Sequence, residues 1–329
     1  MTRTSLALPL IYAIILTLAS CSDKNQINSG AIWGTTYHIT YSSPDNLGDS
    51  ILTVMNDIEQ QLSMFASSSL VSRINRNEDV SVGDSFRRVF EISQKISALS
   101  DGAFDPTVGP LTDLWGFGNV KSDSVIMPKN AAIDAALSTI GINRCTINNG
   151  KVIKPSPDTR FDFSSVAKGY GVDEIARMLS RNGVKDYLVE IGGEIIASGH
   201  NPKRQTWRVQ IDAPVSDSLA HISMYVIPLD NAAVATSGNY RNFRKTTDGS
   251  IGHTIDPRTG YPVRSSTLSA TVISPDCATA DALATACMVL PSDKALEMIE
   301  KLPGAEVLLA VAAPDSIKLI KSSGFPRNI

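Results

Sequence analysis

Several stretches of the chain repeat hydrophobic residues at helical spacing. In residues 52–62, apolar side chains stand at positions 52, 55, 58 and 62, with polar residues between them. Apolar residues that recur every three to four positions form one face of an amphipathic helix, and that face packs on a core. The helices predicted in this way are residues 52–62, 86–99, 131–140, 292–302, the segment that carries 172–179, and a segment from Thr279.

Other stretches alternate apolar and polar residues or form short apolar runs, which is typical of strands. Residues 31–42 alternate, and residues 187–191 form a run that Gly192 and Gly193 end, so we expect a turn or a close backbone approach there. Residues 161–173 are expected to pass from a strand into a helix. The remaining predicted strands are 145–147, 151–153, 207–211, 224–228, 265–274, 307–311 and 316–320.

The order of these elements favours an α+β fold. Hairpins are too frequent for the regular alternation of a doubly wound sheet, and no GxGxxG or P-loop pattern follows a strand. We therefore predict largely antiparallel sheets with flanking helices. The chain is long enough for one large domain or two closely joined lobes that share a core.

The first residues resemble an export signal. Arg3 precedes an apolar run over residues 6–19, which is too short to span a bilayer comfortably. The run ends in Leu-Ala-Ser-Cys21, the pattern of a lipoprotein signal. We therefore expect residues 1–20 to be removed, Cys21 to carry acyl groups, residues 21–30 to act as a tether, and residues 31–329 to fold. Such a protein would be anchored outside the cytoplasm, on a membrane that the sequence does not identify.

Charge and cysteine content exclude some classes of function. Without residues 1–20 the chain carries 29 Lys and Arg against 33 Asp and Glu, and no basic patch stands out, so no nucleic-acid partner is expected. Besides Cys21, the cysteines are Cys145, Cys277 and Cys287, whose spacing matches no zinc or CxxC pattern. Burial of Cys287 is expected, and a Cys277–Cys287 bridge is left open.

Residues 252–262 form a segment rich in turn-forming residues. Pro257, Gly260 and Pro262 restrict or redirect the backbone, so the segment is interpreted as a rigid loop that presents His253, Asp256 and Arg258. A histidine with an ordinary pKa near 6.5 is mostly neutral at pH 7 and can accept a proton.

Asp281 and Thr285 stand four residues apart at the start of a predicted helix and share one of its faces. A carboxylate and a hydroxyl are hard oxygen ligands suited to Mg²⁺, which in such sites usually serves phosphates. The alternative is that Asp281 only caps its helix.

Two further segments suggest a ligand. Lys168 lies near a helix start, where the macrodipole favours anions, so either a phosphate joins it there or it is a surface lysine without a partner. Residues 114–118, Leu-Trp-Gly-Phe-Gly, are rich in aromatic residues and glycine. Such a segment can line a pocket for a planar ligand or can simply pack in the core.

Seven segments together resemble the ApbE family, the FAD:protein FMN transferases once described as thiamine-biosynthesis lipoproteins. They occur in the family's order over residues 31–310. These segments are 33–37 (WGTTY), 101–111 (DGAFDPTVGPL), 161–173 (FDFSSVAKGYGVD), 190–194 (EIGGE), 235–240 (ATSGNY), 253–260 (HTIDPRTG) and 280–285 (ADALAT).

The resemblance implies that the protein binds FAD and moves FMN onto a Ser or Thr hydroxyl of a target protein, with release of AMP. His253 matches the family's catalytic histidine, and Asp281 and Thr285 match its Mg²⁺ ligands, joined by a backbone oxygen at Ser165. The target would be a flavin-bearing subunit of a membrane redox complex. The positions that match FAD contacts are Ala103, Phe104, Asp105, Asp162, Lys168 and Ile255.

Two positions depart from the family pattern. Trp33 stands where many members have Met beside the flavin, and Phe65 stands where Tyr is usual, so a hydroxyl is lost but apolar surface is kept.

Two alternatives to the transferase use the same residues or fewer of them. One is an Mg²⁺-dependent pyrophosphatase that splits FAD into FMN and AMP, and the other is a flavin-binding lipoprotein without catalysis.

Overall fold

The computed structural model describes residues 24–118, 127–214, 222–239, 243–246 and 249–329. The expected signal and Cys21 lie outside these residues. The helices are α1 (Gly48–Leu62), α2 (Leu70–Asn75), α3 (Asp84–Leu99), α4 (Gly109–Leu114), α5 (Asn130–Ser138), α6 (Ala167–Arg181), α7 (Cys277–Val289) and α8 (Ser292–Glu300). The strands are β1 (Lys24–Ile32), β2 (Thr35–Ser43), β3 (Thr146–Asn148), β4 (Lys151–Ile153), β5 (Tyr187–Ile191), β6 (Glu194–Ser198), β7 (Trp207–Asp212), β8 (Ser223–Leu229), β9 (Ala232–Gly238), β10 (Phe243–Thr246), β11 (Gly249–Gly252), β12 (Thr267–Ser274), β13 (Glu306–Ala313) and β14 (Ser316–Lys321).

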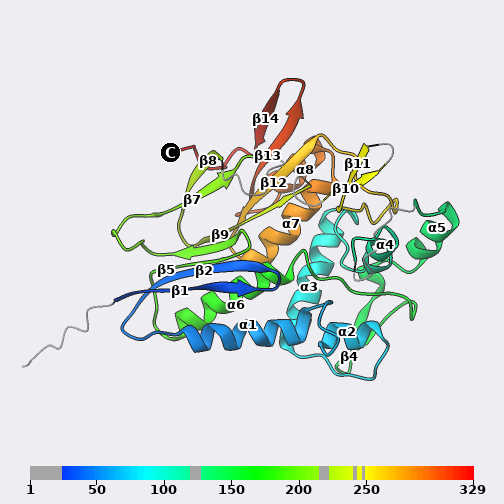
Figure 1. The fold of residues 1–329 in the computed structure, drawn as a ribbon, viewed down its shortest axis with the longest axis horizontal. Coiled ribbons are helices and arrows are strands. Elements are labelled where there is room, and N and C mark those ends of the chain that lie inside the picture. The colour runs from blue at the N-terminus through cyan, green and yellow to red at the C-terminus, as the bar shows by residue number, and fades with distance from the viewer. Residues whose placement is uncertain (1–23, 119–126, 215–221, 240–242, 247–248) are drawn as a thin grey trace, which may run out of the picture.

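Eight strands form the main sheet in the order β1-β2-β5-β6-β9-β12-β13-β14 (Figure 1). Neighbouring strands in this sheet are antiparallel, and three separate hairpins, β3–β4, β7–β8 and β10–β11, complete the described strands. The predicted α+β class with antiparallel sheets is therefore confirmed. Among the residues that the structure describes, no helix is both long and apolar enough to cross a bilayer.

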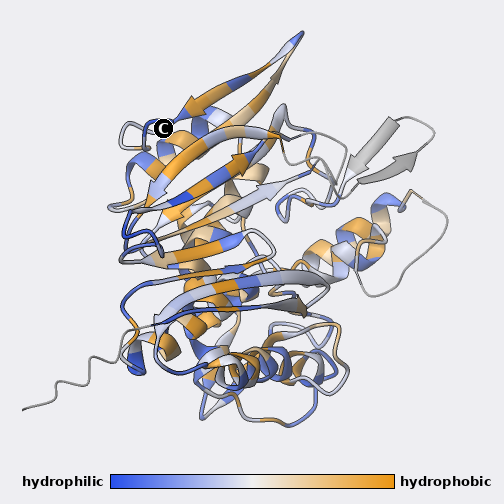
Figure 2. Cartoon of the chain, turned by 60° about the vertical axis from the view of Figure 1, so that its left-hand side comes forward, coloured by the Kyte–Doolittle hydropathy of each residue, from blue (hydrophilic) through white to orange (hydrophobic). Residues whose placement is uncertain are grey.

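Layers of side chains cover both faces of the sheet. Helices α6 and α7 pack on one face, where α7 contacts β9 and β12 and α6 contacts β5 and β6. The β7–β8 hairpin packs on the other face. Adjacent residues of β12 serve both layers, because Val272 belongs to the core on the helix side and Ile273 to the core on the hairpin side. Figure 2 shows the hydrophobic positions concentrated along these strands and helices.

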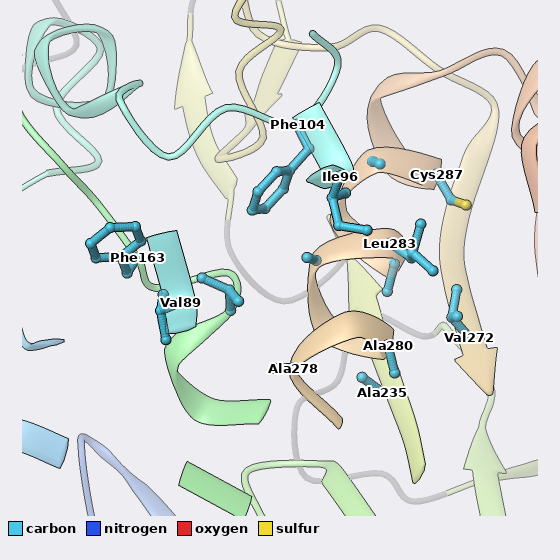
Figure 3. Packing of buried hydrophobic residues seen from close by; sticks show 14 of the residues in the cluster. Val89, Ile96, Phe104, Phe163, Ala235, Val272, Ala278, Ala280, Leu283 and Cys287 are labelled. Atoms are coloured by element: carbon cyan, nitrogen blue, oxygen red, sulfur yellow. The ribbon is translucent and has the colours of Figure 1, made fainter. Parts of the chain in front are cut away.

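Helix α7 lies in the middle of the largest core cluster, and eleven of its thirteen residues are buried. Figure 3 shows Ala278, Ala280, Leu283 and Cys287 of this helix among neighbouring core side chains. A helix buried all round is apolar on every face, so the polar residues Asp281 and Thr285 are exceptions that need partners. Asp276, rather than Asp281, caps the helix, because its side chain accepts the N–H of Thr279 at 2.9 Å.

Helices α6 and α7 approach each other closely. A Cβ atom at Gly169 would lie 2.3 Å from the carbonyl oxygen of Cys277, so only glycine fits at this crossing. Each helix also holds the other by a carboxylate. Asp173 on α6 accepts the N–H groups of Cys277 and Ala278 at 2.8 and 2.9 Å, and Asp281 on α7 accepts the N–H of Gly169 at 3.1 Å. This crossing therefore fixes where Asp281 stands.

The buried position of Asp173 makes stability depend on pH. Burial raises the pKa of this carboxyl to about 7, although the two backbone N–H groups lower it. The folded chain therefore keeps a proton that the unfolded chain loses, and the free energy of unfolding should fall between about pH 4 and about pH 7, by at most about 1.4 kcal/mol per pH unit. Urea unfolding of wild type and of Asp173→Asn across that range measures the effect. An equal pH dependence in both proteins would contradict it.

Several details differ from the sequence-based expectation. Residues 24–30, expected as a tether, pair with β2 as part of strand β1, so the folded part of the chain includes Lys24 onward. Their polar side chains suit an exposed edge strand, which is why the composition resembled a tether. Residues 161–166 do not form the expected strand before α6. Cys145, Cys277 and Cys287 are free and buried, so Cys277 and Cys287 do not pair.

Candidate active site

A cavity of about 710 Å³ lies where α6 begins, beside α7 and the ends of several strands and loops. Eight of the twelve site residues predicted within the folded part line it, although they come from four separate stretches of sequence. These eight are Phe65, Asp162, Ser165, Lys168, His253, Ile255, Asp281 and Thr285.

A lysine and two carboxylates form the charged part of the cavity. The ammonium of Lys168 lies 2.6 Å from Oε1 of Glu194 and 4.0 Å from Oδ2 of Asp281. Both carboxylate side chains are nearly inaccessible to solvent, with 5% and 4% exposed. Lys168 therefore has partners, and the alternative of an unpartnered surface lysine is wrong. These partners also explain why a cation is tolerated at the start of α6, because they offset the positive end of the helix.

Two buried carboxylates share one ammonium group. Burial raises the pKa of Glu194 and of Asp281, and Lys168 acts against that rise in both. For Lys168, burial lowers the pKa, but Asp281 and Glu194 together raise it above its ordinary value. The lysine is thus held charged, and when both carboxylates are ionised one negative charge is left unbalanced. A further cation at this place would relieve that imbalance.

The donor atoms around Asp281 suit a hard cation. Thr285 lies one helical turn after Asp281, and its hydroxyl is 3.2 Å from that of Ser237 on β9. The N–H of Gly169 donates to Asp281, and in the described part of the chain no backbone N–H donates to the carbonyl of Ser165, so that carbonyl is available at the helix start. Within the described residues no three His, Cys, Asp or Glu side chains come together. The carboxylate of Asp281, the hydroxyl of Thr285 and the carbonyl of Ser165 are hard oxygen donors of the kind that Mg²⁺ prefers.

His253 lies on an anchored loop at the cavity. The Thr254 hydroxyl donates to Asn239 at 2.6 Å, and the N–H of Val263 donates to the Thr254 carbonyl at 2.9 Å. The indole of Trp115 donates to the carbonyl of Gly260 at 2.8 Å. These contacts hold the loop at both ends, as expected for a group that must meet a substrate at a fixed place.

The other two side chains that this loop was predicted to present bind each other. Arg258 donates to both carboxylate oxygens of Asp256 at 2.9 and 2.8 Å, and neither residue lines the cavity. Asp256 is therefore engaged in a two-point ion pair. Of the three polar residues predicted on the loop, only His253 faces the cavity.

Aromatic side chains form the less polar walls. The ring of Phe117 meets the imidazole of His253 edge to face, with centroids 6.5 Å apart. Phe65 lies at the opening, with 69% of its surface exposed. Within the segment 114–118, Gly116, Phe117 and Gly118 line the cavity, whereas Trp115 is buried in a core cluster.

Four predicted contact residues do not line the cavity. Ala103 and Phe104 are each 1% exposed and belong to the largest core cluster, where Figure 3 shows Phe104 beside Ile96. Asp105 is turned inward to Thr107 and to the N–H of Ile142. Trp33 lies in the β1–β2 turn and packs over Gly171 of α6. Residues 116–118 line the cavity, whereas Ala103, Phe104 and Asp105 do not.

Some lining residues were not predicted. Glu194 follows Gly192 and Gly193, whose φ angles of 65° and 101° make the tight turn that places it at the cavity. The sequence does contain a sign of this turn, because the pair Gly192 and Gly193 ends the apolar run of β5 directly before the acidic residue Glu194. Thr236 and Ser237 also line the cavity and lie in a segment that carries the family resemblance. Their hydroxyl side chains do not change the hydrophobic pattern of a strand, so that pattern does not identify them as site residues.

Three comparisons agree with one another. The model of the ApbE family matches residues 33–309. The FAD:protein FMN transferase of Vibrio cholerae is 35% identical over 95% of this chain and 96% of the relative, and that of Haemophilus influenzae is 33% identical over 96% and 95%. The solved structure of the flavin transferase ApbE from Vibrio cholerae superposes with a TM-score of 0.81 at 33% identity, covering 92% of this chain and 98% of that one.

Proposed function

The chain belongs to the ApbE family, and from this premise we propose that it transfers FMN from FAD to a Ser or Thr hydroxyl of a target protein, with release of AMP. The observation that carries the proposal is the gathering of Lys168, His253, Asp281 and Thr285 around one cavity. Binding alone needs neither a proton acceptor nor paired hard oxygen ligands.

In the proposed reaction the acceptor oxygen attacks the phosphorus of the FMN half of FAD. A new P–O bond forms, the bond from that phosphorus to the bridging oxygen breaks, and the electron pair leaves with AMP. His253 takes the proton of the acceptor hydroxyl. Lys168, held charged by its carboxylates, offsets negative charge on the phosphate oxygens.

Asp281, Thr285 and the carbonyl of Ser165 are the groups that would hold Mg²⁺. When bound, the ion would neutralise charge that develops on the phosphate oxygens. Phe117 and Phe65 offer aromatic surface to the planar rings of FAD, and the exposure of Phe65 places that surface at the opening.

The experiment combines the purified protein with FAD, Mg²⁺ and a candidate acceptor flavoprotein, then measures AMP and FMN bound covalently to the acceptor. Equal amounts of both products support the transferase. AMP and free FMN in place of labelled acceptor would favour a pyrophosphatase. FAD binding without AMP would indicate a binding protein. The same assay without Mg²⁺ tests the proposed cation dependence.

We also propose that the protein is anchored to a membrane outside the cytoplasm through acyl groups on Cys21. The motif Leu-Ala-Ser-Cys21 after a short apolar run supports this. A Cys21→Ala chain should no longer incorporate labelled fatty acid and should leave the membrane fraction, because two or more acyl chains supply the stable attachment. FMN transfer by the folded domain should be unchanged. Membrane partitioning equal to wild type would count against the anchor.

A further inference from the structure

Glu194 occupies an unfavourable environment that its own interactions do not offset. Only 5% of its side chain is exposed. Oε1 accepts from Lys168, whereas Oε2 is buried and has no hydrogen-bond partner in the described part of the chain. A buried carboxylate with an unpaired oxygen opposes folding. Its place at the cavity therefore indicates a role in the site.

The positions of the charged atoms suggest what this role is. Lys168 contacts Glu194 directly at 2.6 Å, but its nitrogen is 4.0 Å from the nearest oxygen of Asp281. The lysine ammonium is a compact charge on a flexible stem, so it moves to whichever carboxylate accepts it. With Glu194 neutral, the remaining carboxylate within reach would be Asp281. That oxygen already accepts the N–H of Gly169, so its place is fixed and the lysine would have to move.

We propose that Glu194 is a positioning residue that holds the ammonium of Lys168 away from Asp281 and so leaves the Asp281 carboxylate open to a divalent cation. The inference rests on the proposed function, since it takes Asp281 as a cation ligand. Glu194 and Lys168 neutralise each other, and the charge of Asp281 remains to attract the cation. Without Glu194, Lys168 would neutralise Asp281 and repel a cation at the same place.

The test measures binding of Mn²⁺ alone to the full-length chain, by the electron paramagnetic resonance of the free ion. The proteins are wild type, Glu194→Gln, Lys168→Met, the double variant and Asp281→Asn, each checked for folding by circular dichroism. Glu194→Gln should weaken Mn²⁺ binding roughly 10- to 100-fold, the range found when a supporting partner of a metal ligand is removed. Adding Lys168→Met to it should restore affinity to within about threefold of wild type, whereas Lys168→Met alone should change affinity much less.

This non-additivity distinguishes positioning from simple charge. If Lys168→Met raises Mn²⁺ affinity by the same factor with and without Glu194, the two residues act only as separate charges and the inference is wrong. A crystal structure of Glu194→Gln gives an independent measurement. Lys168 should then lie within hydrogen-bond distance of Asp281, and a lysine that stays away from Asp281 would overturn the proposal.

Asp281→Asn separates this inference from the proposed function. Equal Mn²⁺ affinity in wild type and Asp281→Asn would remove the proposed cation site, and the inference with it. Loss of binding in Asp281→Asn together with additive effects at Glu194 and Lys168 would leave the cation site in place and overturn only the positioning role.

Discussion

Replacement of Asp281 with alanine is expected to abolish Mg²⁺-dependent turnover, with a loss of at least about 10³-fold. Asp281 is the carboxylate of the proposed cation site, and charge stabilisation by a bound metal contributes several kcal/mol to a reaction at phosphate, where each 1.36 kcal/mol is tenfold in rate. Thr285→Ala should lose less, because a neutral hydroxyl is the weaker ligand. AMP release as a function of Mg²⁺ concentration measures both.

Two controls make this result specific. Asp281→Asn keeps an oxygen that can accept the N–H of Gly169 but removes the charge, so it should lose turnover while losing less stability than Asp281→Ala. Asp173→Asn alters the matching carboxylate at the same crossing of α6 and α7 but does not line the cavity. It should keep its Mg²⁺ dependence. Mg²⁺-dependent turnover in a folded Asp281→Ala protein would show that Asp281 serves only to join the two helices.

Replacement of His253 with asparagine or alanine should lower FMN transfer by about 10²- to 10⁴-fold, the usual contribution of a general base. Affinity for FAD should change little, because His253 is proposed to act on the acceptor hydroxyl. Single-turnover FMN transfer and FAD binding by fluorescence separate these two effects. A collapse of FAD affinity would make His253 part of the pocket wall and place the base elsewhere.

The structure also narrows the choice of an alternative base. Asp256 is a carboxylate on the same loop, but its two oxygens accept from Arg258 and it does not line the cavity. Asp256→Asn should therefore leave the transfer rate near wild type in a folded protein. His38→Asn is a matched histidine control, since His38 pairs with Glu190 and does not line the cavity either.

Local signals in the sequence were sufficient for many elements. The helical stripe of residues 52–62 is the second part of α1, and the run at residues 187–191 is β5. Residues 24–30 were not predicted as a strand because an edge strand needs no apolar face. Residues 161–166 form no strand before α6, although Phe161 and Phe163 are buried in the largest core cluster.

The sequence by itself determined the chemistry that is available. The helical spacing of Asp281 and Thr285 and the turn-forming residues around His253 are local features of the chain, and each of the seven family segments is short. Only the tertiary structure decided which side chains share the cavity. Phe104 and Asp105 turn into the core, whereas Phe117 and Glu194 reach the site. The reason is physical, because a side chain's direction depends on packing against segments far away in sequence, which local periodicity does not encode.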